Sequence, residues 1–189
     1  QFLKLNTDYR YLWKIDRNNS VAARIAGGVI WSYGNALAAP YTEQFYIGGA
    51  NSVRAFSARN IGPGGYAPDK ESKYSFINHV GDIRLEANVE YRFRIIGDLH
   101  GAVFLDAGNV WLMRKDDSRP NGEFSLKNFA KQIALGTGAG LRYDMDFLVF
   151  RLDCGVGLHD PYETGKSGYY NIPKFKDSLA LHFAIGYPF

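Results

Sequence analysis

Three charged residues from separate parts of the sequence could form a buried ion-pair network. Arg54 lies in the stretch FYIGGANSVRAFSARNIGPGGY, where Phe56 and other apolar residues flank it. Glu90 and Asp106 follow in two later segments, NVEYRF and FLDAGNVW. A guanidinium removed from bulk water needs carboxylates that accept paired hydrogen bonds. We therefore expect Arg54 to bind Asp106 and Glu90, and we call the candidate site formed by Arg54, Phe56, Glu90 and Asp106 the loop lock.

Residues that would support catalysis, metal binding or nucleotide binding show no matching pattern. The histidines lack metal-ligand spacing, and no serine or cysteine nucleophile accompanies His159 and Asp160 in a suitable context. The glycine-rich segment GTGAG, residues 136–140, has neither Gly-x-Gly-x-x-Gly spacing nor a Gly-Lys-Ser/Thr sequence. We expect no enzyme activity, no cofactor and no metal. A net charge of +3 is too small to indicate a nucleic-acid partner.

The composition favours a β-barrel membrane protein over a soluble β-sandwich. The 189 residues suit one domain, 15% of them are aromatic, and the mean hydropathy is −0.25. No run approaches the roughly 18 apolar residues of a membrane helix. Alternating strands rich in aromatic residues average out as polar, which is typical of transmembrane barrels. The sequence begins at Gln1 without a signal peptide, which indicates a mature or excised piece of a longer protein.

Seven segments alternate apolar and polar residues with the period of a β-strand. In the segment 83–95 the odd positions are apolar, whereas Arg84, Glu90 and Arg92 lie on the other face. Charges of both signs mixed with glycines suit a crowded aqueous lumen, so we predict that the odd positions face lipid. The expected strands are residues 3–15, 21–33, 83–95, 99–111, 133–144, 148–157 and 179–189.

Short and long connections alternate along the chain. Residues 16–20, 97–98 and 144–146 form short links, whereas residues 34–81, 112–132 and 159–177 form long ones. Outer-membrane barrels have short periplasmic turns and long external loops. This pattern predicts an all-β antiparallel transmembrane barrel with its C-terminus on the periplasmic side.

Several motifs resemble those of the outer-membrane barrel-assembly superfamily, which includes the BamA and TamA barrels and related secretion transporters. Val53-Arg54-Ala55-Phe56 is similar to its Val-Arg-Gly-Phe/Tyr signature, and FLDAGNVW is similar to its Phe-x-Asp-x-Gly motif. GAGLRY, residues 138–143, and the Arg151-Leu-Asp153 segment resemble its closing strands. Ala55 replaces the usual glycine, and it would be strained if that position required a positive φ.

The resemblance implies a location within a larger barrel. Residues 1–189 would form its C-terminal portion, about the last seven of sixteen strands, without the periplasmic POTRA domains. The loop of about residues 34–81 would enter the lumen, where Arg54 would meet Asp106 and Glu90. The implied function is noncatalytic insertion of β-barrel proteins through a weak lateral seam. The implied location is the bacterial outer membrane, and the implied partners are outer-membrane lipid, nascent β-barrel proteins, and accessory assembly proteins bound through the missing periplasmic domains.

The segment 179–189 would form one side of the seam. Its apolar face includes Phe183, Tyr187 and Phe189, which resemble a terminal assembly signal or form a lipid-facing aromatic girdle. A two-partner secretion transporter of the same superfamily remains the alternative function, and the number of periplasmic domains would discriminate the two. Because seven strands leave two edges, the isolated piece could be an open sheet, an edge-paired oligomer or part of a larger assembly.

Overall fold

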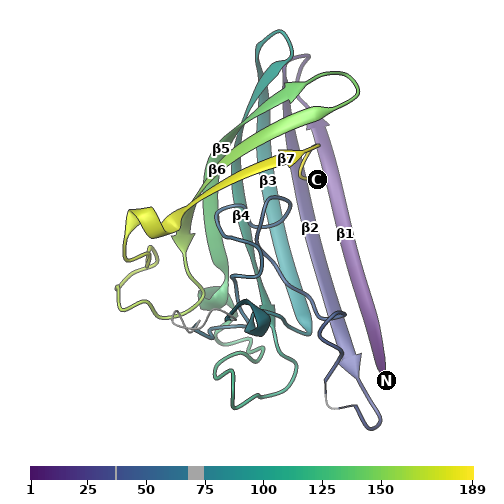
Figure 1. Cartoon of the computed structure of the whole chain (residues 1–189), viewed down its shortest axis with the longest axis vertical. Coiled ribbons are helices and arrows are strands. Elements are labelled where there is room, and N and C mark those ends of the chain that lie inside the picture. Colours follow the sequence, from purple (N-terminus) through teal and green to yellow (C-terminus); the bar gives the residue numbers. More distant parts are fainter. Residues whose placement is uncertain (37, 68–74) are drawn as a thin grey trace.

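A computed structural model describes residues 1–36, 38–67 and 75–189, except for the side chains of Ser75 and Phe76. It contains one antiparallel sheet of seven strands in chain order (Figure 1). The helices of the described residues are short 3-10 turns, and none has the length and hydropathy needed to cross a membrane. The strands are β1 (Phe2–Lys14), β2 (Asn19–Ser32), β3 (Ile83–Ile96), β4 (Leu99–Trp111), β5 (Ala134–Asp144), β6 (Val149–His159) and β7 (Leu179–Ile185), and the 3-10 turns are η1 (Ser75–Asn78), η2 (Phe129–Gln132) and η3 (Phe175–Ser178).

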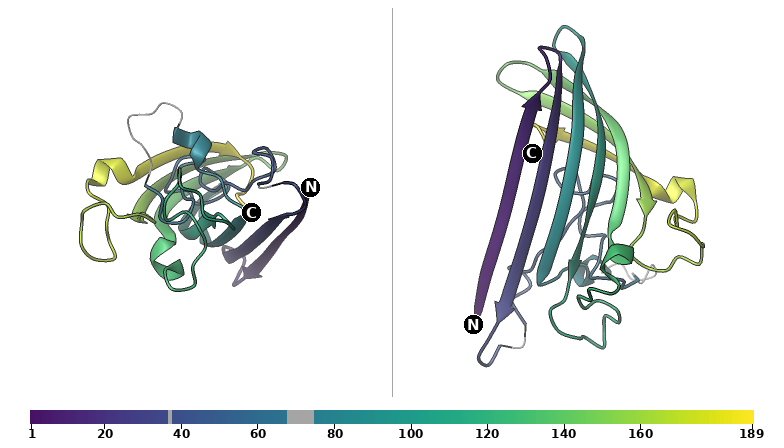
Figure 2. Two further views of the ribbon diagram at one scale, coloured as in Figure 1. Left: turned by 90° about the horizontal axis from the view of Figure 1, so that it is seen from below. Right: turned by 180° about the vertical axis from the view of Figure 1, so that it is seen from behind.

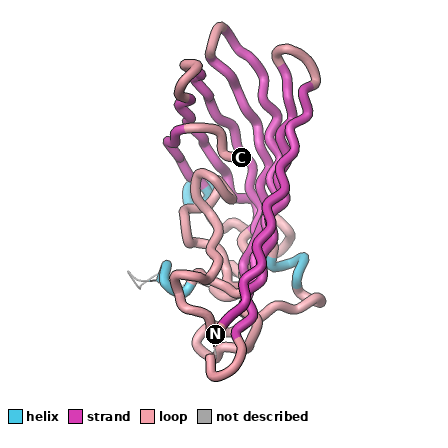
Figure 3. The backbone as a smooth tube through the Cα atoms, turned by 90° about the vertical axis from the view of Figure 1, so that its right-hand side faces the viewer, coloured by secondary structure: helices cyan, strands magenta, loops and turns pink. Residues whose placement is uncertain are grey.

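The sheet is curved and open. Figure 2 shows the strands bent around the long β2–β3 connection, and Figure 3 shows the long loops gathered toward the end of the sheet opposite the short turns. β1 and β7 each pair along one edge, so the sheet does not close on itself. Short turns link β1 to β2, β3 to β4, and β5 to β6 at one end, which we call the turn end. The long connections lie at the opposite end, which we call the loop end.

Alternation along each strand separates the two faces of the sheet. In β3, Glu86 and Glu90 are 1% and 0% exposed, whereas Val89 and Tyr91 are 47% and 38% exposed. The odd positions of this strand therefore face outward on the convex side, as predicted. A register shift of one residue would invert this assignment, and the continuous pairing of β3 with β2 and with β4 up to Arg94 fixes it.

The apolar core lies between the concave face and the β2–β3 connection. Ile47, Val53 and Ile61 of the connection are fully buried, and they pack with Ile30 of β2 and Val110 of β4. The sheet contributes small residues where the loop approaches. The long connection is therefore anchored by apolar burial as well as by charge.

The last strand is shorter than predicted. β7 ends at Ile185, so the expected strand boundary at residue 189 is wrong. Gly186 has a φ of +85°, a conformation that favours glycine, and Pro188 cannot donate a backbone hydrogen bond. The chain consequently leaves the sheet and turns Tyr187 and Phe189 toward Arg92 on the concave face.

Candidate functional site

The tip of the β2–β3 connection is a tight loop held by its own hydrogen bonds. The amide of Gly49 donates to the carbonyl of Phe56 over 2.8 Å, and the amide of Gly48 donates to the Ser52 hydroxyl over 3.0 Å. Gly48 and Gly49 have φ values of +98° and +89°. A side chain at Gly48 would also collide with the Ser57 carbonyl. Glycine is needed here for both reasons, and the resulting geometry directs Arg54 into the concave face.

Arg54 forms a three-point contact with Asp106 of β4. Its Nε and Nη2 donate to the Asp106 Oδ2 and Oδ1 over 2.8 Å and 2.9 Å. Its backbone amide also donates to Oδ2, over 3.0 Å. Both side chains are fully buried. A fork-to-fork pair of this kind is stronger and more specific in geometry than a single contact.

Glu90 of β3 is shared among three arginines. Its Oε2 accepts from the Nη1 of Arg54, and from the Nη2 of Arg142 over 3.0 Å. Its Oε1 accepts from the Nε of Arg92 over 2.7 Å. Arg142 also donates to the Asp153 Oδ1 over 2.6 Å. The loop arginine is therefore one member of a network that crosses β3, β5 and β6.

Aromatic and backbone contacts complete the surroundings of Arg54. The centre of its guanidinium lies 3.6 Å from the centroid of the Phe104 ring, which permits a cation–π interaction. The Nε2 of His182 lies 2.9 Å from the Arg54 carbonyl oxygen. The Phe189 ring lies 5.7 Å from the guanidinium centre. β4, β7 and the segment after β7 thus all contact the same loop residue.

Asn51 joins the loop tip to strands on both sides of the sheet. Its carbonyl oxygen accepts from the Nη1 of Arg24 in β2 over 3.3 Å, and its side-chain Oδ1 accepts from the Nη2 of Arg151 in β6 over 2.5 Å. Arg24 also pairs with Asp8 of β1 and Glu86 of β3, over 3.0 Å and 2.9 Å. The tip is therefore a brace that spans the concavity of the sheet.

The expected contacts of Arg54 with Asp106 and Glu90 are present, whereas Phe56 has a separate environment. Phe56 is 8% exposed and belongs to the apolar core. Ala55 is not among the described residues with a positive φ, so the strain considered for this position does not arise. A side chain added at Gly136 would meet the Cβ of Ala55, so the tip rests directly on β5.

Sequence reasoning did not identify the remaining members of the network. They share inward positions on the strands, and the sequence signals for them were this alternation and, for Arg142, Arg151 and Asp153, the resemblance of their segments to closing strands of the superfamily. Their mutual pairing depends on strand register and on sheet curvature, which period-two patterning does not specify. These residues are Asn88, Phe104, Arg142, Arg151, Asp153 and His182.

The three residues of the expected seam strand do not share one face. Phe183 is 68% exposed on the convex side and stacks on Phe150, with ring centroids 6.0 Å apart. The Tyr187 ring lies 4.5 Å from the guanidinium centre of Arg92, and the Phe189 carbonyl oxygen accepts from the Nη2 of Arg92 over 3.3 Å. Tyr187 and Phe189 therefore do not extend the outward aromatic girdle.

A curved antiparallel sheet with an apolar convex face and an internally braced loop defines a membrane β-barrel architecture, here present as an open part of a barrel. The model of the Omp85 superfamily domain matches residues 1–189, and the chain belongs to that superfamily.

Two curated relatives carry the same name. The "Outer membrane protein assembly factor BamA" of Nitratidesulfovibrio vulgaris is 26% identical over 185 residues, which cover 96% of this chain and 20% of that protein. The protein of that name from Neisseria meningitidis serogroup B is 30% identical over 89 residues, which cover 44% of this chain and 11% of that protein. The chain thus corresponds to a minor part of the length of these relatives.

Two solved structures share the fold. BamA from Haemophilus ducreyi, in a form lacking POTRA domains 1–3, matches with a TM-score of 0.68 and 16% identity, over 98% of this chain and 35% of that chain. CdiB from Acinetobacter baumannii matches with a TM-score of 0.54 and 18% identity, over 97% of this chain and 26% of that chain. The sheet corresponds to the C-terminal part of the BamA barrel.

Proposed function

We propose that this chain is the C-terminal barrel portion of a noncatalytic outer-membrane protein assembly factor. The observation that carries the proposal is the similarity to the N. vulgaris protein named as such a factor, which extends over 96% of the chain. The protein would lie in the bacterial outer membrane with its C-terminus on the periplasmic side. Its partners would be membrane lipid, nascent β-barrel proteins, and accessory assembly proteins bound through periplasmic domains.

The strand edges support a mechanism based on backbone pairing. β7 has 7 residues, whereas β1 and β2 have 13 and 14, so the last strand presents the shortest edge. Unpaired backbone groups in lipid each cost several kcal/mol. A short last strand would pair weakly with the first strand of a complete barrel, and the opened seam would template an incoming strand by β-augmentation. The loop lock would preserve the curvature of the wall while the seam opens.

Reconstitution of the full-length protein in liposomes tests this function. We expect an unfolded β-barrel client to acquire the heat-modifiable gel mobility of a folded barrel faster in these liposomes than in protein-free liposomes. The similarity in fold to CdiB supports a second candidate, a two-partner secretion transporter of the same superfamily. If the client stays unfolded while an unfolded secreted polypeptide crosses the membrane, the insertase proposal fails and transport is supported.

Deletion of Phe189 tests the proposed terminal signal. Its ring contacts Arg54 and Arg92 rather than lipid, so loss of the aromatic contacts alone should cost about 0.5–2 kcal/mol. If the residue also serves as an assembly signal, deletion should reduce the membrane-inserted fraction severalfold and leave protein in the periplasm. The measurement is the inserted fraction at normal expression.

Phe147→Ala provides the control for that deletion. Phe147 is an exposed aromatic residue between β5 and β6, outside the terminal segment. We expect this variant to insert normally. If the protein that lacks Phe189 inserts normally and only its melting temperature changes, the proposed assembly signal is refuted.

A further inference from the structure

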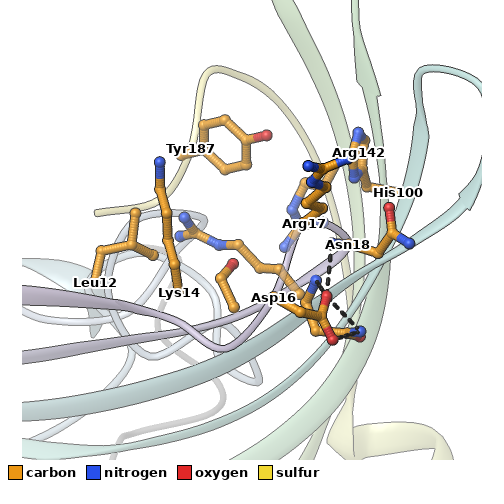
Figure 4. Close-up of a pocket in the computed structure, with 11 residues that line it drawn as sticks. Leu12, Lys14, Asp16, Arg17, Asn18, His100, Arg142 and Tyr187 are labelled. Atoms are coloured by element: carbon orange, nitrogen blue, oxygen red, sulfur yellow. Dashed lines mark hydrogen bonds between the residues drawn. The ribbon is translucent and has the colours of Figure 1, made fainter.

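The turn end of the concave face contains a cavity that the loop lock does not fill. Its volume is about 720 Å³, within the range of ligand sites (Figure 4). Five basic side chains line it, and we call them the basic basin: Lys14, Arg17, Arg92, His100 and Arg142. The remaining lining comes from Leu12, residues 16 and 18–20 of the β1–β2 turn, and Tyr187. The basin therefore joins the first strand, the centre of the sheet and the segment after β7.

Strand register concentrates positive charge at this end. Arg94 of β3 pairs with His100 of β4, His100 pairs with Arg142 of β5, and Arg142 pairs with Arg151 of β6. Like charges directly opposite one another on neighbouring strands are unfavourable. Glu90 and Asp153, at neighbouring positions, balance part of the positive charge of this row.

The acidic residues of the concave face only partly compensate the basin. Glu90 and Asp153 accept hydrogen bonds from Arg142, and Glu90 also accepts from Arg92. The Nε of Arg142 is nevertheless buried without a hydrogen-bond partner, as are the Nε and Nη1 of Arg151. Arg142 and Arg151 are 0% and 1% exposed, so these donors are also withheld from bulk water.

Three members of the basin have no partner within the described part of the chain. The side chains of Lys14, Arg17 and His100 make no hydrogen bond or ion pair there. Figure 4 shows their side chains around the same space as Arg142 and Tyr187. The basin thus combines the unpaired side chains of Lys14 and Arg17 at its rim with buried arginines at its base.

The nearby carboxylates do not neutralise this charge. Asp16 is the one carboxylate in the cavity lining of the described residues, and it accepts the backbone amides of Asn18 and Asn19 over 2.7 Å and 2.8 Å. The side-chain amide of Asn19 and these backbone amides hold the pKa of Asp16 below its usual value. Asp144 interacts with the hydroxyl of Tyr187 at the edge of the cavity. Both acids are therefore engaged in local contacts.

We propose that the basic basin binds an acidic polypeptide segment, whose Asp or Glu carboxylates bridge Lys14 and Arg17 at its exposed rim. Carboxylates match the fork geometry of the Arg17 guanidinium and pair with the Lys14 ammonium. The position favours a polypeptide over a lipid headgroup, because the basin is on the concave face whereas Trp13 and Tyr11 of β1 are exposed on the convex face. This inference goes beyond the proposed function, since it concerns a binding site whose occupancy does not require client insertion.

Peptide binding to the full-length protein in detergent micelles tests the proposal. The probe is a fluorescein-labelled decapeptide of alternating Glu and Ser, and its control replaces every Glu with Gln. Fluorescence anisotropy should detect binding of the Glu peptide alone. The affinity should fall as salt rises from about 50 to about 300 mM, because salt screens partly exposed charges.

The double variant Lys14→Gln/Arg17→Gln should bind the Glu peptide about fivefold to tenfold more weakly, as expected for two partly exposed charge pairs. Lys115→Gln/Lys127→Gln is the matched control, because it removes the same charge from the β4–β5 connection at the loop end and should leave the affinity unchanged. Insertion of a β-barrel client is measured in parallel on the same variants. The peptide-binding result can then be judged separately from the result of the insertase test. Equal binding of the Glu and Gln peptides, or equal losses in the two double variants, would overturn the proposal. The proposal would also fail if the Lys14→Gln/Arg17→Gln variant still bound the Glu peptide but no longer bound vesicles that contain anionic lipid.

Discussion

Replacement of Arg54 by alanine is expected to lower the free energy of unfolding of the full-length protein by about 3–5 kcal/mol. The reason is that removal of one partner leaves buried charge without compensation. Asp106 would lose both of its hydrogen bonds from the Arg54 side chain and keep only the one from the backbone amide, and Glu90 would lose one of its arginine partners. Both carboxylates are fully buried. The effect should appear in urea-induced unfolding in lipid, followed by heat-modifiable gel mobility.

Two variants separate the ion network from a general effect of changing the loop. Arg59→Ala removes another arginine from the same connection, but Arg59 is partly exposed and its guanidinium centre lies 4.4 Å from the Tyr46 ring. It should cost no more than about 1 kcal/mol. Arg54→Lys should recover part of the loss, because an ammonium keeps the charge without the paired hydrogen bonds. If Arg54→Ala and Arg59→Ala had equal stabilities, and client assembly were normal in both, the loop lock would have no role in either property.

Period-two patterning was sufficient to predict the inward acids of the site. Glu90 and Asp106 alternate with apolar neighbours, so their face follows from the strand period. The flanking apolar residues likewise indicated that Arg54 would be buried. The partners of Glu90 were less predictable. Arg142 lies close enough to bind Glu90 because of the way β3 pairs with β4 and β4 pairs with β5. Register and curvature are properties of the assembled sheet rather than of any one segment.

The end of the chain was mispredicted because two local signals conflict. Tyr187 and Phe189 continue the apolar alternation of β7, which favours a strand that runs to residue 189. Gly186 and Pro188 are the residues that commonly interrupt a strand. In the structure Gly186 adopts a positive φ, and the chain turns inward after Ile185. The aromatic residues then contact Arg92 in place of lipid, so the correct interpretation depended on a backbone conformation and not on hydrophobicity.

Gly155 of β6 should also be sensitive to substitution, because the loop tip rests against its backbone. A Cβ added at Gly155 would lie 2.5 Å from the Arg54 carbonyl oxygen and 2.7 Å from the Ala55 Cα, closer than real side chains approach. Gly155 also pairs with Gly138 on β5 and with Ala180 on β7, so a row of small residues forms the floor beneath the tip. We expect Gly155→Ala to displace the tip and to lower the free energy of unfolding by about 1–3 kcal/mol.

Gly157→Ala is the control for this substitution, since it adds the same methyl group two residues further along the inner face of β6. Its nearest neighbours would be Ile172 and Phe56, each at 3.5 Å, which is an ordinary contact distance. Neither Gly155 nor Gly157 is among the described glycines with a positive φ, so the backbone should tolerate alanine equally at both. Gly157→Ala should therefore leave stability unchanged or raise it by a few tenths of a kcal/mol.

The combination of Gly155→Ala with Arg54→Ala tests whether both act through the same bound loop. If the added methyl group displaces the tip, the network around Arg54 is already disrupted, and the second substitution should cost less than it does alone. We expect the combined loss in unfolding free energy to be smaller than the sum of the single losses by about 1–3 kcal/mol, as for residues in direct contact. Urea unfolding of the unsubstituted protein, the two single variants and the double variant supplies the four free energies of this cycle. Strictly additive losses would show that the fit of the tip against β6 and the ion pairs of Arg54 stabilise the barrel independently.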